Sequence, residues 1–187
     1  IPFLIKAPQI KNTVKIVNTP VTGVDLFPTL LELAGIENPI DLDGKSLVPL
    51  LKNENFETRS LFWHYPHYGN QGGDPSAIIR KGDWKLIHYF EDGKNELYHL
   101  IDDMGETNNI IDQYPGKGMG LKNELENWLS STAAKIPKID PQYDEEEEKK
   151  WLREHKQKLK LKVERERALQ LSPKFLPNED WWGSAIH

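Results

Sequence analysis

Residues 76–100 read SAIIRKGDWKLIHYFEDGKNELYHL, a stretch in which β-branched and aromatic residues alternate with polar ones. Three runs within it predict β-strands, at residues 76–80, 84–90 and 95–100. The dipeptide Asp92-Gly93 between the last two runs is a strong signal for a hairpin turn. The stretch therefore predicts an antiparallel meander, in which strands that follow one another in the chain pair with each other.

Side chains alternate between the two faces of a strand, so the run at 84–90 presents two different surfaces. One face carries Trp84, Leu86, His88 and Phe90, and the other carries Lys85, Ile87 and Tyr89. The largely apolar first face predicts that a helix covers this side of the sheet.

The covering helix is predicted at residues 115–134, where Pro115 suits the first helical turn. Its apolar stripe consists of Leu121, Leu125, Trp128, Leu129 and Thr132. A further strand-like run, Leu61-Phe62-Trp63, precedes the meander. The middle of the chain is therefore expected to be an α+β fold, a small antiparallel β-sheet covered by a helix.

The beginning of the chain contains one apolar run and one helix. The run Ile1–Ile5 predicts a short strand buried on both faces, and such a strand needs neighbouring strands that this sequence does not offer nearby. The helix is predicted at residues 25–34. Asp25 is its expected N-cap, and Gly35 is a natural terminator.

The chain changes character after Tyr143. Residues 144–167 contain 8 acidic and 9 basic residues among 24 positions, and opposite charges four residues apart are typical of a solvated helix. The apolar stripe of this predicted helix is thin and consists of Leu152, Leu159 and Val163. We expect a solvated, partly docked helix, and Trp181-Trp182 is aromatic enough to dock as well.

Composition excludes several classes of chemistry. The 187 residues include no cysteine, which excludes disulfides, thiolate zinc sites and thiol nucleophiles. The net charge of −5 shows no basic excess, so we expect no nucleic-acid partner. No apolar run approaches the roughly 20 residues of a membrane span, so none is expected. The apolar run Ile1–Ile5 is too short for a signal peptide.

The stretch richest in chemical groups is residues 64–73, which read HYPHYGNQGG. Imidazole, phenol and amide groups lie there on a loop punctuated by proline and glycine, and such loops often carry ligand-binding side chains. These groups suit sugar hydroxyls or an oxyanion. The candidate substrate-binding residues are His64, His67, Asn70 and Gln71. Two alternatives stay open: an aromatic loop packed on the sheet, and a His-x-x-His metal pair without an obvious third ligand nearby.

Other motifs do not complete a catalytic set. The segment 41–44, Asp-Leu-Asp-Gly, looks like the start of a calcium loop, but its glycine comes too early and the twelfth position is Lys52, so we expect a turn. Asp102 and Asp103 follow a strand, where capping or a turn is the expected role. Neither a Gly-x-Ser-x-Gly motif nor a phosphate-binding Gly-Lys-Ser/Thr loop occurs. The residues alone therefore lead to no reaction.

Six segments of the chain together carry a family resemblance. They are residues 2–8, 19–35, 41–51, 59–66, 77–87 and 96–109. In this order they are similar to the C-terminal part of formylglycine-dependent sulfatases of the alkaline phosphatase superfamily. The resemblance covers residues 1–142, and the tail from Tyr143 matches no feature of that family.

The resemblance implies a division into domains. Residues 1–55 are expected to be the end of an alkaline-phosphatase-like α/β catalytic domain, with its last strand and helix. Residues 56–142 are the expected C-terminal subdomain, an antiparallel sheet plus a helix, and residues 143–187 are a charged helical tail. The resemblance also implies that the chain is the C-terminal part of a longer enzyme, with the N-terminal catalytic part as its partner.

The chemistry that the resemblance implies needs groups outside this chain. The family's nucleophile is a formylglycine made from the first residue of a Cys/Ser-x-Pro-x-Arg motif, which this sequence lacks. The ligands of the family's calcium lie before the matching region, so no catalytic and no metal residue is assigned here. The implied class is a sulfuric ester hydrolase, and the chain alone is expected to be inactive and without a cofactor of its own.

In such enzymes the C-terminal subdomain borders the substrate pocket, which makes the loop 64–71 the candidate for contacts with the leaving alcohol. The expected function is hydrolysis of the sulfate ester of a carbohydrate or an aryl alcohol. Two other hypotheses stay open: the same subdomain in a phosphoesterase or phosphonate hydrolase, and a stand-alone carbohydrate- or protein-binding module. Bacterial members are usually exported, so a periplasmic or secreted location is expected.

Overall fold

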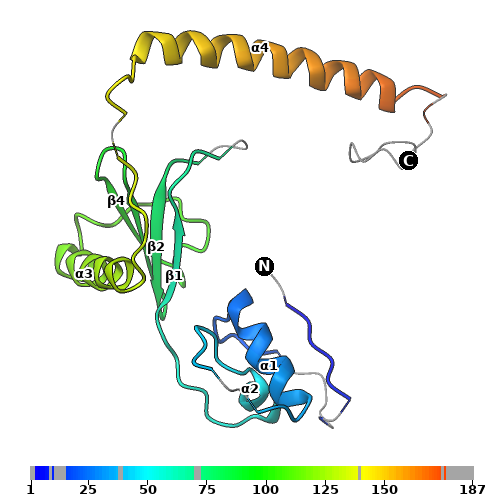
Figure 1. Cartoon of the computed structure of the whole chain (residues 1–187), viewed down its shortest axis with the longest axis vertical. Helices are drawn as coiled ribbons and strands as arrows, with labels where there is room; N and C mark the ends of the chain where they lie inside the picture. Colours follow the sequence, from blue (N-terminus) through cyan, green and yellow to red (C-terminus); the bar gives the residue numbers. More distant parts are fainter. Residues whose placement is uncertain are drawn as a thin grey trace. The chain divides into compact units, whose positions relative to one another are not determined.

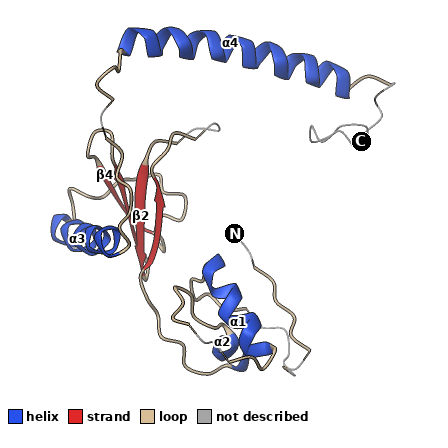
Figure 2. Cartoon of the chain, in the orientation of Figure 1, coloured by secondary structure: helices blue, strands red, loops and turns tan. Residues whose placement is uncertain are grey.

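The computed structural model describes residues 3–8, 10, 16–37, 40–69, 73–138, 140–173 and 175. The chain divides into two units, Ile1–Lys138 and Ile139–His187, which are described separately here. Figures 1 and 2 show the helices and strands of both units.

The first unit contains the expected sheet. Its strands are β1 (Leu61–Tyr65), β2 (Ser76–Lys81), β3 (Trp84–Tyr89) and β4 (Asn95–His99). They follow the order β1-β2-β3-β4, and every neighbouring pair is antiparallel. Figure 2 draws these strands in red. The four-stranded sheet confirms the predicted meander.

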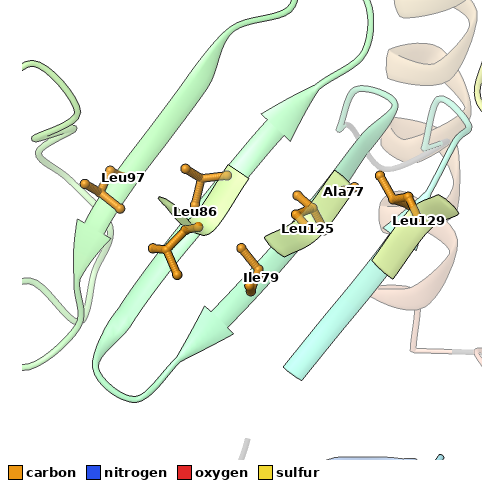
Figure 3. Close-up of a cluster of buried hydrophobic side chains, with 7 residues drawn as sticks. Ala77, Ile79, Leu86, Leu97, Leu125 and Leu129 are labelled. Atoms are coloured by element: carbon orange, nitrogen blue, oxygen red, sulfur yellow. The ribbon is translucent and has the colours of Figure 1, made fainter. Parts of the chain in front are cut away.

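One face of the sheet is covered by α3 (Pro115–Ser131), as the apolar stripe predicts. The fully buried Leu125 lies at the centre of a cluster that Figure 3 shows between helix and strands. Its buried members are Ala77, Ile79, Leu86, Leu97, Leu121, Leu125 and Leu129. At the edge of the cluster the ring of Phe62 stacks on Trp128, with 4.8 Å between the ring centroids. The expected α+β class is thereby confirmed.

Nearer the N-terminus lie a short 3-10 helix at Gly23–Asp25, α1 (Leu26–Leu33) and α2 (Val48–Lys52). The helix α1 ends where the sequence indicates, since Gly35 adopts a left-handed backbone with φ of 68°. The Asp25 side chain does not cap α1. It turns back and accepts a hydrogen bond from the Thr22 backbone N–H at 2.9 Å.

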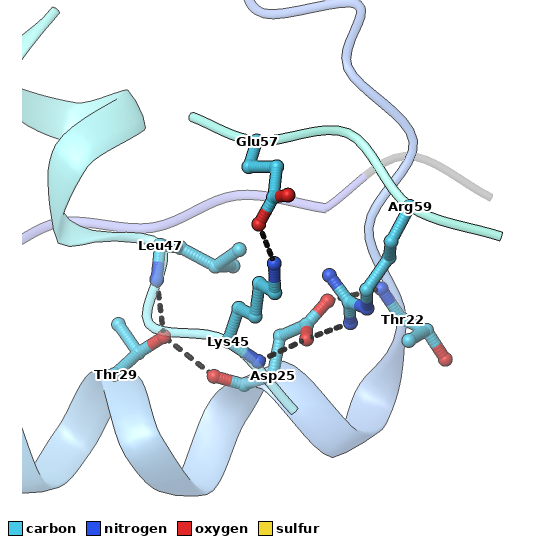
Figure 4. A network of polar contacts seen from close by, with 7 residues as sticks. All are labelled: Thr22, Asp25, Thr29, Lys45, Leu47, Glu57 and Arg59. Atoms are coloured by element: carbon cyan, nitrogen blue, oxygen red, sulfur yellow. Dashed lines mark hydrogen bonds and ion pairs between the residues drawn. The ribbon is translucent and has the colours of Figure 1, made fainter. Parts of the chain in front are cut away.

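The Asp25 carboxylate is the centre of a polar network, shown in Figure 4. It is fully buried, accepts a second hydrogen bond from the Lys45 backbone N–H at 2.9 Å, and forms an ion pair with the Arg59 guanidinium. Thr29 extends the network, because its hydroxyl accepts from the Leu47 N–H at 2.8 Å and donates to the Asp25 carbonyl at 2.5 Å. The network joins α1 to the segments 45–47 and 57–59.

The apolar run at the start of the chain differs from its prediction. Residues 3–5 form no strand, and Phe3 and Leu4 are 49% and 95% exposed. No strand among the described residues pairs with them, so the burial that an apolar strand requires is absent here. Ile1 and Pro2 lie outside the described residues.

The second unit contains α4 (Glu145–Gln170), the charged helix that the sequence predicts. Asp144 caps it, because its carboxylate accepts from the backbone N–H groups of Glu146 and Glu147 at 2.9 and 3.1 Å. None of its residues is buried. Trp181-Trp182 lies outside the described residues. In the part of the chain that the structure describes, every helix is too short or too polar to cross a membrane.

Candidate functional site

His64 lies near the end of β1, on the sheet face that α3 covers. The sheet register pairs His64 with Ala77 on β2, Ala77 with His88 on β3, and His88 with Asn95 on β4. These side chains therefore form one row across the sheet. The imidazole of His64 meets the edge of the Phe90 ring, with 5.4 Å between the centroids and an angle of 77° between the planes.

The Nε2 atom of His64 is buried and has no hydrogen-bond partner among the residues that the structure describes. A buried polar atom of this kind costs on the order of 1–3 kcal/mol when it is left unsatisfied. Burial lowers the pKa of His64, and the neighbouring His67 lowers it further. The ring is therefore neutral near pH 7 and offers a hydrogen bond that nothing in the described residues takes.

The predicted loop begins later than expected, because His64 and Tyr65 belong to β1, and the second predicted histidine, His67, lies in the loop after this strand. Its ring meets Tyr65 edge-on, with centroids 5.5 Å apart. The loop is closed by a hydrogen bond from the Gly69 N–H to the Gly73 carbonyl at 3.0 Å. The structure thus brings His64 and His67 together, while the other two predicted residues, Asn70 and Gln71, lie outside the described residues.

Sequence reasoning did not include His88 in the candidate site. Its ring also contacts Phe90 edge-on at 5.4 Å between centroids, so Phe90 lies between two imidazoles. Nδ1 of His88 donates to the Asn95 side-chain oxygen at 2.9 Å, which fixes the ring orientation and leaves Nε2 free to accept. Strand alternation in the sequence already places His88 on the apolar face of the sheet. Its neighbours in the row, His64 on β1 and Asn95 on β4, follow only from the strand register.

A cavity of about 280 Å³ lies on the β3–β4 side of the first unit. Its lining includes Asp74, Tyr89, Glu91, Asp92, Lys94 and Glu96. Glu96 already accepts hydrogen bonds from Lys94, Tyr98 and Tyr89 at 2.6, 2.9 and 3.0 Å. Burial and the bond to Glu96 raise the pKa of Tyr89 to about 12, so its hydroxyl stays protonated. The carboxylate of Glu96 is therefore occupied by hydrogen bonds within the chain.

Asp102 and Asp103 have the structural roles that the sequence predicts. The Asp103 carboxylate accepts from the backbone N–H groups of Thr107 and Asn108, and these bonds lower its pKa. Asp102 pairs with Nδ1 of His99 at 2.5 Å beside a cavity of about 370 Å³. Among the residues that the structure describes, no three His, Asp or Glu side chains are grouped to hold a metal ion.

The first unit is thus an antiparallel four-stranded sheet under one helix, with an aromatic loop after its first strand. Residues 1–135 match the family described as N-sulphoglucosamine sulphohydrolase, C-terminal, and the chain belongs to this family. The resemblance noted from the sequence is thereby confirmed.

Three similar proteins illustrate the relationship. A sulfatase of Formosa agariphila is 34% identical over 148 residues, which is 69% of this chain and 27% of that protein. The N-acetylglucosamine-6-O-sulfatase of Bacteroides thetaiotaomicron is 32% identical over 154 residues, 78% of this chain and 26% of that protein. A solved structure, described as a complex with its substrate D-glucosamine-2-N,6-O-disulfate, is 34% identical with a TM-score of 0.50, covering 57% of this chain and 23% of that chain.

The chain spans about a quarter of the length of the curated relatives that it matches. It is homologous to sulfatases over their C-terminal part, and the resemblance says nothing about residues that the matched region does not contain.

Proposed function

We propose that this chain is the substrate-contacting C-terminal part of a sulfatase that hydrolyses the sulfate ester of a carbohydrate or an aryl alcohol. The match of residues 1–135 to a C-terminal sulfatase family carries the proposal, and the imidazoles of His64, near the end of β1, and His67, in the loop after it, are the candidate contacts. The Nε2 atom of His64 is covered by protein atoms, so a substrate hydroxyl reaches it when the side chains over it move aside, and the hydroxyl then satisfies it because a hydroxyl both donates and accepts.

The neutral state of His64 favours the alcohol side of the substrate over the sulfate. A protonated imidazole attracts an anion, whereas a desolvated neutral ring exchanges a hydrogen bond with an uncharged group. Phe90 and Tyr65 place aromatic rings next to His64 and His67, and apolar ring faces suit the C–H surfaces of a sugar. The name of the Bacteroides relative, an N-acetylglucosamine-6-O-sulfatase, agrees with a carbohydrate substrate.

The bond-breaking chemistry belongs to another part of the enzyme in this proposal. In the family a formylglycine and a calcium ion supply sulfate transfer, and this chain contains neither a cysteine nor a Ser-x-Pro-x-Arg sequence. What the residues of this chain do is orient the alcohol and shield it from water. Orientation of this kind lowers the barrier because the reacting groups need not be brought together at random.

The proposal includes the N-terminal catalytic part as the partner of the first unit. The exposed side of α1 carries Phe27 and Leu30, which are 54% and 60% exposed, and Val24 beside them is 50% exposed. An apolar group of this density on a surface is typical of an interface. Since the matched relatives are about four times as long as the matched region, the remaining part of such an enzyme is the occupant that we propose.

The test is sulfatase activity measured on two polypeptides with 4-nitrophenyl sulfate. We expect no turnover by the 187-residue chain and turnover by the longer gene product, lost when its Cys/Ser-x-Pro-x-Arg nucleophile is changed to Ala. Turnover by the 187 residues alone contradicts the division of labour. A longer product without that motif contradicts the sulfatase assignment and favours the phosphoester or phosphonate alternative.

A further inference from the structure

The long helix α4 presents a feature that the sulfatase proposal does not use. It has 26 residues, a length of about 39 Å at 1.5 Å per residue. No residue of α4 is buried. A helix of this length with an exposed apolar stripe is stabilised when that stripe meets a partner.

The charges of α4 are unevenly divided along its length. Residues 144–155 contain six acidic and three basic residues, a net charge of −3. Residues 156–170 contain six basic and two acidic residues, a net charge of +4. Pairs within the helix, such as Lys149 with Glu145 at 2.7 Å and Lys162 with Glu166 at 3.7 Å, neutralise charges locally but do not remove this polarity.

The apolar stripe lies on one side of the helix, near its middle. At 100° per residue, Leu152, Leu159 and Val163 fall within about 40° of one another, and the stripe runs for about 16 Å. Their side chains are 39%, 51% and 53% exposed. Leu161 points about 180° away from the stripe and is 64% exposed, so it offers a matched residue on the opposite side.

We propose that α4 pairs with α4 of a second copy of this chain in antiparallel orientation. In that arrangement the acidic half of each helix lies against the basic half of the other, and the central stripes face each other. A parallel pair instead brings acidic against acidic and basic against basic halves, which is repulsive. The contact is isologous, because the same surface of both copies is used.

Charge complementarity selects the second copy as the occupant of the stripe. A partner of single charge sign would match one half of α4 and repel the other. A copy of the same helix, reversed, matches both halves at once. The proposal therefore predicts self-association that weakens as salt rises, since most of these charges are solvent-exposed.

The experiment is sedimentation velocity on the full 187-residue chain at low and high salt, with circular dichroism to verify helix content. We expect wild type to form dimers at low salt. Leu159→Glu raises the dimer dissociation constant by at least about tenfold, because it places a charge in the apolar contact. The control Leu161→Glu leaves the constant within about threefold, because its side chain faces away from the pair.

Charge reversal provides a second measurement. One variant changes four basic residues to Glu: Lys156, Lys158, Lys160 and Lys162. A second variant adds four changes to Lys: Glu145, Glu146, Glu147 and Glu148. We expect the first to be monomeric and the second, with both halves reversed, to dimerise again.

Three results overturn the proposal. The first is a wild type that stays monomeric at low salt. The second is equal behaviour of L159E and L161E, which places any self-association on another surface, such as the exposed side of α1. The third is association that strengthens with salt, because an apolar contact without charge pairing behaves in that way.

Discussion

Replacement of Asp25 by Ala tests the polar network of the first unit. The buried carboxylate accepts from the N–H groups of Thr22 and Lys45 and pairs with Arg59, whose side chain is 18% exposed. Loss of Asp25 leaves the Arg59 charge largely buried without its partner. Removal of one member of a buried pair costs about 3–5 kcal/mol, and we expect D25A to lower the local free energy of unfolding by that amount.

The assay is amide hydrogen exchange, followed at the Leu47 N–H. This amide donates to the Thr29 hydroxyl rather than to Asp25, so its protection reports on the network and not on a bond that the substitution removes. A loss of about 3–5 kcal/mol accelerates its exchange roughly 140- to 4000-fold, at tenfold per 1.4 kcal/mol. The variant D25N keeps the shape and one acceptor oxygen, and we expect a smaller acceleration.

A double-mutant cycle identifies the ion pair as the origin of the effect. If the two side chains act together, D25A/R59A costs less than the sum of D25A and R59A, because no unpaired charge remains in the double variant. The reasoning is refuted if D25A changes Leu47 exchange less than about fivefold, a difference below roughly 1 kcal/mol, or if the two single effects add without coupling.

The remaining predictions concern close packing, helix propensity and pH. Gly44→Ala should destabilise the first unit in urea unfolding, because its Cβ would lie 1.9 Å from the Val24 carbonyl oxygen, a backbone atom with nowhere to move; an unchanged midpoint contradicts this packing. Gly120→Ala should stabilise α3 by about 0.8–1 kcal/mol, since the space there is open and Ala favours helix; Gly118→Ala is its control, because its Cβ would meet the Ile111 side chain at 2.3 Å and should lose that gain. Folding lowers the pKa of His64, so the contribution of the neutral ring to stability is present above the ordinary pKa of 6.5 and is lost as pH falls below that value toward the folded pKa. His64→Gln should therefore flatten the decline of stability from pH 7.5 to 5.5. An unchanged slope argues against a desolvated ring.

The sheet and its covering helix follow from the sequence because their signals are local. Alternation over residues 84–90 and the turn at Asp92-Gly93 specify the β3–β4 hairpin, and the leucines of α3 repeat at helical spacing. The strand pattern gives the sheet one apolar face, and the leucine spacing gives α3 one apolar side. Among these elements, each of the two apolar surfaces can be buried only against the other. The class of fold is thus fixed by periodicity.

The network around Asp25 could not be read in the same way. Its partners Thr22, Lys45 and Arg59 come from three separate segments, up to 34 residues away in the chain. An Asp before an apolar run is usually an N-cap, so the local rule predicts that the Asp25 carboxylate caps α1. The carboxylate instead binds the partners from the three segments. The run at residues 3–5 illustrates the converse, since apolar composition predicts burial only when a partner is present.

The candidate site was predictable in part for a similar reason. His64 and His67 lie three residues apart in one polar, aromatic stretch of the sequence, so composition suggested them. His88 and Phe90 join them through the register of β1, β2 and β3, which depends on turn lengths and on the core beneath the sheet. The burial of the His64 Nε2 atom without a partner among the described residues results from tertiary packing, and no sequence pattern predicts it.

The most direct test of the proposed function is the ratio of kcat/KM values for two substrates in the complete sulfatase. N-acetylglucosamine 6-sulfate has hydroxyls that His64 can bind, and 4-nitrophenyl sulfate has none. We predict that His64→Ala lowers kcat/KM for the sugar sulfate about tenfold, as expected for one lost hydrogen bond, and leaves the aryl sulfate unchanged. The control His155→Ala, on α4, should change neither. Equal losses on both substrates, or no loss on the sugar sulfate, would contradict the assignment of His64 to the leaving alcohol.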